Sequence, residues 1–100
     1  MLADIQLDER QLSEFCRSHG IRKLALFGSV LRDDFDPESD VDILVEFQPG
    51  RTPGFMGIAR LEREFSKLVG GLPVEAHTEA SLSRYFREEV LREASVQYVA

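Results

Sequence analysis

The chain has 100 residues, 43% hydrophobic and 30% charged, with a formal net charge of -6. This length and composition predict a single folded domain spanning residues 1–100. The acidic balance argues against nucleic acid binding, which needs a basic surface. No apolar run approaches the ~20 residues of a membrane span, so we expect a cytoplasmic protein. The single cysteine, Cys16, lies on the apolar face of a predicted helix, and we expect it to be a buried small hydrophobe.

The first predicted elements are an amphipathic helix between Asp8 and Gly20 and a strand over residues 23–27. Asp8 is a typical N-cap, Gln11 completes a capping box, and Gly20 is a typical C-terminal stop. A continuous apolar run such as residues 24–27 is typical of a strand that is buried on both faces. Gly28-Ser29 then ends the strand, and we expect Ser29 to cap a short helical turn.

The clearest predicted strand covers residues 40–47, after a polar loop at 33–39. Its side chains alternate between two faces. One face carries Val41, Ile43, Val45 and Phe47, and the other carries Asp40, Asp42, Leu44 and Glu46. Aspartate is disfavoured inside strands, so two aspartates in an otherwise apolar strand favour a functional role. The structural alternative is that Asp40 begins the strand and Asp42 faces water.

The second half begins with a turn at 48–54 and an amphipathic helix from Ile58 to Val69 that Gly70-Gly71 ends. A third strand follows over residues 72–77, and a helical tail is predicted over 79–98. This order predicts an α/β (α+β) fold with a small mixed β-sheet and helices packed on one face. The other face would carry the carboxylates and would be the working face.

These carboxylates and the Gly-Ser turn are suited to a nucleoside triphosphate and its metal ions. Backbone N–H groups at Gly28 and Ser29 can bind phosphate oxygens. Asp40 and Asp42 share a strand face with Cα atoms roughly 6.5 Å apart, which suits two Mg²⁺ ions. Glu75 supplies a third carboxylate if its strand lies beside theirs. His77 shares the face of Glu75, and it either lines the site or is a satisfied histidine at a strand end.

The residues 26–32, Leu-Phe-Gly-Ser-Val-Leu-Arg, and 39–45, Ser-Asp-Val-Asp-Ile-Leu-Val, resemble the G-S-x10-D-x-D signature of the DNA polymerase β-like nucleotidyltransferase superfamily. The small size is similar to its minimal nucleotidyltransferases, the MNT or MntA-like domains. The resemblance implies metal-binding and catalytic roles for Asp40, Asp42 and Glu75, although Asp is more usual at the third position. It implies nucleotide binding by Gly28, Ser29 and Arg32. From the residues alone, Arg32 either contacts phosphate or pairs with a neighbouring aspartate.

The resemblance also implies a reaction and a partner. Minimal nucleotidyltransferases of this kind are typically encoded beside a small helical HEPN ribonuclease toxin. They neutralise it as antitoxins, by Mg²⁺-dependent transfer of AMP from ATP to a toxin tyrosine. One alternative is a catalytically weak or inactive antitoxin that neutralises its partner by binding, for which Glu75 in place of Asp is the only hint. Another is nucleotidyl transfer to RNA or a small molecule, which the acidic charge disfavours.

Overall fold

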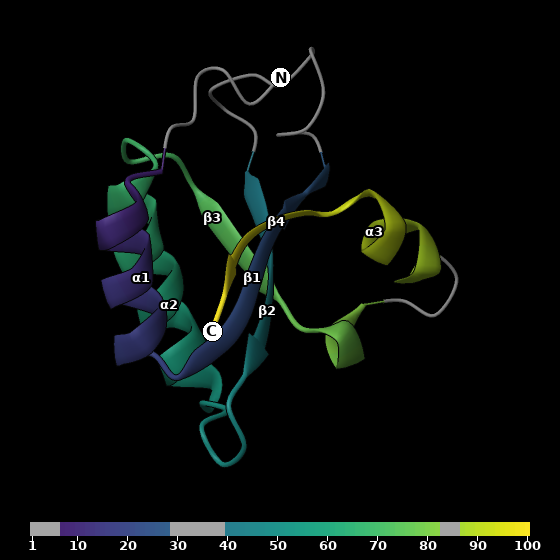
Figure 1. Cartoon of the computed structure of the whole chain (residues 1–100), viewed down its shortest axis with the longest axis horizontal. Coiled ribbons are helices and arrows are strands. Elements are labelled where there is room, and N and C mark those ends of the chain that lie inside the picture. Colours follow the sequence, from purple (N-terminus) through teal and green to yellow (C-terminus); the bar gives the residue numbers. More distant parts are fainter. Residues whose placement is uncertain (1–6, 29–39, 83–86) are drawn as a thin grey trace.

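The computed structural model describes residues 7–28, 40–82 and 87–100. The elements run from the N-terminal helix to a C-terminal strand (Figure 1). Their bounds are α1 Glu9–Ser18, β1 Ile21–Phe27, β2 Val41–Phe47, α2 Phe55–Leu68, β3 Val74–His77, the 3-10 helix η3 Glu79–Ser81, α3 Arg87–Glu93 and β4 Ser95–Val99. The expected turn after Gly28 and the loop at 33–39 fall at residues outside this description. No helix in the described ranges is long and apolar enough to cross a membrane.

The strands of the described residues form one mixed sheet in the order β3-β2-β1-β4. Strand β1 pairs antiparallel with both β2 and β4, and β2 pairs parallel with β3. Parallel neighbours need a crossover connection, and α2 provides it between β2 and β3. The predicted mixed sheet is therefore confirmed.

Helices α1 and α2 pack on one face of the sheet and enclose the main core (Figure 1). The core takes the alternate side chains of the strands, because successive residues of a strand point to opposite faces. Its least exposed members are Cys16, Leu24, Val41, Ile43, Leu61 and Phe65, each 0% exposed. Cys16 is buried, which confirms the expectation of a buried small hydrophobe, and burial raises the pKa of its thiol to about 12.

Local sequence signals account for the bounds of α1. The backbone N–H of Gln11 donates to the Asp8 carboxylate over 2.9 Å, so Asp8 caps the helix as predicted. Gly20 follows the helix with φ +67, a left-handed conformation that favours glycine. His19 lies at the C-terminal cap, where its Nε2 is 2.9 Å from Oε1 of Glu64 on α2.

The prediction of a continuous helix over residues 79–98 is wrong. Helix α3 covers only Arg87–Glu93, and Ser95–Val99 forms β4 on the outer side of β1. Without β4, the central strand β1 would leave one row of N–H and C=O groups unpaired. The sequence of β4 is rich in β-branched and aromatic residues, which suits a strand. The backbone N–H of Ala100 adds a 2.8 Å bond to the carbonyl of Arg22.

The C-terminal segment also covers part of the second sheet face. Ala25, Phe27, Leu44 and Leu82 form a smaller core there, and Val90 and Ala94 pack against it. Helix α3 consequently lies on the opposite side of the sheet from α1 and α2 (Figure 1). The expectation of helices on one face therefore describes the two long helices, while α3 adds a short cover to the other face.

Candidate active site

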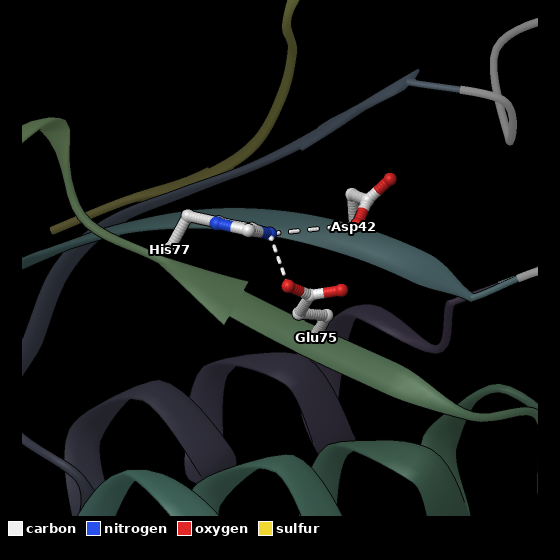
Figure 2. A group of neighbouring side chains, drawn as sticks. All are labelled: Asp42, Glu75 and His77. Atoms are coloured by element: carbon white, nitrogen blue, oxygen red, sulfur yellow. Dashed lines mark ion pairs between the residues drawn. The ribbon is translucent and has the colours of Figure 1, made fainter. Parts of the chain in front are cut away.

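The parallel pairing of β2 and β3 brings two of the predicted carboxylates together. Asp42 is the register partner of Glu75, and Leu44 is the partner of His77. Because side chains two residues apart share a strand face, Glu75 and His77 both project beside Asp42. Figure 2 shows the three side chains pointing toward one another from two neighbouring strands.

The imidazole of His77 lies between the two carboxylates. Its Nε2 is 3.5 Å from Oδ1 of Asp42 and 3.5 Å from Oε1 of Glu75. The contact with Asp42 is the largest cause that raises the pKa of His77. Burial opposes this shift, and the negative charge of Glu75 adds to it. A protonated imidazole here compensates the repulsion between two neighbouring carboxylates.

Phe27 holds the imidazole ring from the end of β1. The Phe27 and His77 rings are edge-on, with centroids 5.3 Å apart and planes at 68°, an arrangement that aromatic pairs favour. The side chains of His77 and Asp42 are 22% and 24% exposed, whereas that of Glu75 is 54% exposed. The site is therefore a partly buried pair, His77 and Asp42, with a more exposed third group, Glu75.

Gly28 lies directly against Asp42 at the end of β1. Its φ is +79, and a Cβ at this position would lie 2.7 Å from Oδ2 of Asp42. A side chain would therefore be strained by the backbone and would also collide with the carboxylate. Glycine at this position lets the backbone pass close to Asp42. A turn whose backbone approaches phosphate groups needs glycine for the same reason.

Strand β3 is an edge strand, and α2 holds it in place. Oε2 of Glu62 accepts a 2.7 Å hydrogen bond from the backbone N–H of Ala76, the residue between Glu75 and His77. The hydroxyl of Ser66 donates to the carbonyl of Leu72 over 2.7 Å, just before the strand. These bonds satisfy one backbone group of β3 and one just before it, and the bond at Ala76 helps to orient the two site residues on either side.

The remaining predicted site residues lie apart from this cluster or outside the described chain. Asp40 is exposed and precedes β2, and it is not among the three clustered side chains. Ser29 and Arg32 fall outside the described residues. The roles predicted for these residues, and the catalytic roles of Asp42 and Glu75, therefore stay predictions. For His77, whose two interpretations were left open, the structure places the ring at the carboxylates.

The donor set fits a divalent cation. The nearest ligand atoms of Asp42, Glu75 and His77 all lie within 4.8 Å of one another. Carboxylate oxygens are the usual ligands of hard cations. The third donor here is an imidazole nitrogen, which is also a common metal ligand. A small α/β domain with a glycine turn against such a cluster fits the class of nucleotide-binding transferases that use a divalent cation.

Comparison with known families agrees with this class. The family model for the nucleotidyltransferase domain matches residues 9–96. The chain belongs to this family and is a nucleotidyltransferase, which confirms the resemblance drawn from the Gly-Ser turn and the paired aspartates.

Relatives and solved structures of similar architecture come from the minimal members of this group. The protein adenylyltransferase MntA of Thermococcus cleftensis is 36% identical over 74 residues, which cover 74% of this chain and 72% of the relative. The solved structure of a candidate minimal nucleotidyltransferase is 37% identical, with a TM-score of 0.68 over 86% of this chain and 85% of the other. An MNT antitoxin complexed with the tri-AMPylated HEPN toxin of Shewanella oneidensis gives a TM-score of 0.64 at 18% identity, over 92% and 70% of the chains.

Proposed function

We propose that this chain is a cytoplasmic, Mg²⁺-dependent protein adenylyltransferase that acts as the antitoxin of a HEPN ribonuclease toxin. It would transfer AMP from ATP to a tyrosine of that toxin. The similarity to a relative named protein adenylyltransferase MntA supports the reaction. The fold shared with an MNT antitoxin in complex with a tri-AMPylated HEPN toxin supports the partner.

One observation carries the proposal: the parallel register of β2 and β3 places Glu75 beside Asp42, with Gly28 against Asp42. Asp40, Asp42 and Glu75 would hold two Mg²⁺ ions. Such ions neutralise the triphosphate and lower the pKa of an acceptor hydroxyl. Gly28, Ser29 and Arg32 would bind the phosphates.

In this reaction the tyrosine oxygen forms a bond to the α-phosphorus of ATP. The bond between that phosphorus and the oxygen bridging to the β-phosphate breaks, and pyrophosphate leaves. The proton of the tyrosine hydroxyl passes to the carboxylate of Glu75, which is exposed enough to return it to water. A more exposed Glu75 beside a more enclosed Asp42 suits this division of roles.

The test is AMP transfer to the cognate HEPN protein in the presence of ATP and Mg²⁺, followed by intact mass spectrometry. We expect the mass of the partner to rise by whole AMP units and the increase to disappear with EDTA. Replacing Asp40 and Asp42 together by Asn should abolish transfer. Glu46→Gln is the matched control, because Glu46 is a carboxylate on the same strand that pairs with Arg22 instead. Absence of a mass increase with the wild-type protein would refute the proposal.

The position of Glu75 weighs against the one sequence hint for the binding-only alternative. Glu75 is one methylene longer than aspartate, yet its carboxylate still lies within 4.8 Å of the Asp42 and His77 donor atoms. A glutamate here therefore does not remove the third carboxylate from the site. If the Asp40/Asp42 double variant still neutralised the toxin at wild-type level, neutralisation by binding would replace transfer as the function.

A further inference from the structure

We propose that His77 is a nitrogen ligand of the cation held by Asp42 and Glu75, so that the site prefers a first-row transition ion such as Mn²⁺ over Mg²⁺. The inference rests on the proposed cation-dependent function and concerns which ion the site selects. His77 lies two residues after Glu75 on the same face of β3, and its Nε2 points between the two carboxylates (Figure 2).

The position of Nε2 differs from that of a histidine paired with one partner. An N–H donor closes to about 2.7–3.2 Å from an acceptor oxygen in an ordinary hydrogen bond. His77 is instead 3.5 Å from an oxygen of Asp42 and also 3.5 Å from an oxygen of Glu75. In contrast, the other histidine, His19, closes to 2.9 Å on Glu64. The separations of Nε2 from the two carboxylates are equal and longer than an ordinary hydrogen bond, so Nε2 is not committed to either carboxylate.

These separations suit a shared metal ion. Two donor atoms 3.5 Å apart are close enough to bind one ion through metal–ligand bonds of about 2.1–2.2 Å. The donor atoms of Asp42 and Glu75 lie within 4.8 Å of each other, and the carboxylate of Glu75, the most exposed of the three groups, would move closer to complete the set.

The chemistry of the donors sets the ion preference. Mg²⁺ demands near-ideal octahedral geometry, binds oxygen ligands and keeps several waters. A site with an imidazole nitrogen binds transition ions in the Irving–Williams order, along which affinity rises from Mn²⁺ toward Cu²⁺. Phe27 packs edge-on against the His77 ring and so limits its motion, which favours a fixed ligand. Mg²⁺ would still occupy the site where it is in large excess.

Mn²⁺ binding to the whole chain tests the assignment. Pulsed EPR detects a nitrogen ligand of Mn²⁺ as ¹⁴N modulation, and titration gives the dissociation constants of Mn²⁺ and Mg²⁺. We expect ¹⁴N modulation in the wild-type protein and its loss in His77→Gln. Because loss of a partner that only orients a ligand costs 10–100-fold in affinity, we expect the Mn²⁺ dissociation constant to rise at least about tenfold. The Mg²⁺ constant should change much less.

The matched control is His19→Gln, which removes the only other histidine of the chain and should leave the modulation unchanged. Thermal unfolding checks that each variant folds. If His77→Gln fails to fold, the ¹⁴N modulation of the wild-type protein still tests the assignment. Absence of ¹⁴N modulation, absence of Mn²⁺ binding, or equal weakening of both ions would overturn the assignment. AMP transfer without nitrogen coordination would overturn this inference alone, whereas nitrogen coordination without AMP transfer would overturn the proposed function alone.

Discussion

The two faces of strand β2 belong to different parts of the molecule. On one face Val41, Ile43 and Val45 are at most 1% exposed and pack under α1 and α2. On the other face Asp42 keeps a side chain that is 24% exposed and lies beside groups from β3. The helical face is built from apolar contacts that stabilise the fold. The face with Asp42 collects charges whose mutual repulsion only a proton or a cation relieves. Substitutions on the two faces should therefore separate stability from activity.

The largest expected effect is on stability, from Phe65→Ala on the helical face. Phe65 is 0% exposed and packs against Phe15 with ring centroids 5.3 Å apart. Removing a buried phenylalanine costs about 3–5 kcal/mol, much of the stability of a small domain. Urea unfolding measures the loss. Phe55→Ala on the same helix is the control, because Phe55 is 88% exposed and surface substitutions change stability by about 0.5 kcal/mol or less. Equal losses would contradict the assigned core.

Gly28→Ala should reduce activity by disturbing Asp42 on the other face of β2. The left-handed backbone costs alanine about 1–2 kcal/mol, and the new methyl group would displace the Asp42 carboxylate. Gly50→Ala isolates the second effect, since Gly50 has φ +76 with no atom within 4 Å of a built Cβ. We expect similar losses of stability in the two variants, measured by urea unfolding. AMP transfer should fall at least about tenfold only in Gly28→Ala, because one displaced ligand costs more than 1.4 kcal/mol of transition-state stabilisation.

If Gly50→Ala lost transfer to the same extent, the backbone strain and not the contact with Asp42 would explain the defect.

Glu62→Ala tests whether the hydrogen bond from α2 to β3 holds the site residues of β3 in place. Loss of the carboxylate leaves the N–H of Ala76 without its 2.7 Å partner and should cost about 1 kcal/mol. Because Ala76 lies between Glu75 and His77, we expect faster amide hydrogen exchange at residues 75–77 and weaker cation binding. Glu14→Ala, at an exposed position of α1, should change neither. Unchanged exchange in Glu62→Ala would show that β3 does not depend on α2 for its order.

The smallest expected effect is the pH dependence of stability that comes from the contact between His19 of the α1 cap and Glu64 of α2. Hydrogen bonds from His19, then from Arg60, lower the pKa of Glu64 below its usual 4.5. A lowered folded-state pKa stabilises the protein above the unfolded value, and this contribution is lost as the pH falls through the folded value. The side chain of Glu64 is 36% exposed, so solvent screens the effect. The stabilities of wild type and Glu64→Gln should differ slightly at pH 6, and the difference should shrink as the pH falls below the usual pKa of 4.5. A difference that grows there would contradict this account.

Much of the fold follows from local patterns in the chain. The Asp8 cap and the Gly20 stop bound α1 as predicted. The alternation in residues 40–47 predicted which side chains of β2 enter the core. The exception is β4, whose residues follow a helical run and were predicted to continue it. Its strand conformation depends on the unpaired edge of β1, some seventy residues earlier in the chain, and no local pattern reports such an edge.

For the site, the sequence identified the residue types but not their arrangement. Asp42 and Glu75 were predicted to meet only if their strands were neighbours, and the parallel pairing of β2 and β3 meets this condition. The signal for His77 was its position two residues after Glu75 on one strand face, which placed it near the site without showing its distance from Asp42. Asp40 remains a predicted ligand outside the observed cluster.

The sequence by itself determined the limits of α1, the apolar face of β2 and the chemical class of the site. These depend on residues near one another in the chain, through caps, turns and side-chain periodicity. The tertiary structure alone decided strand order, the position of β4 and the contact of His77 with both carboxylates. These depend on pairing between distant segments, and in a parallel pair a shift of one residue would turn Glu75 and His77 away from Asp42.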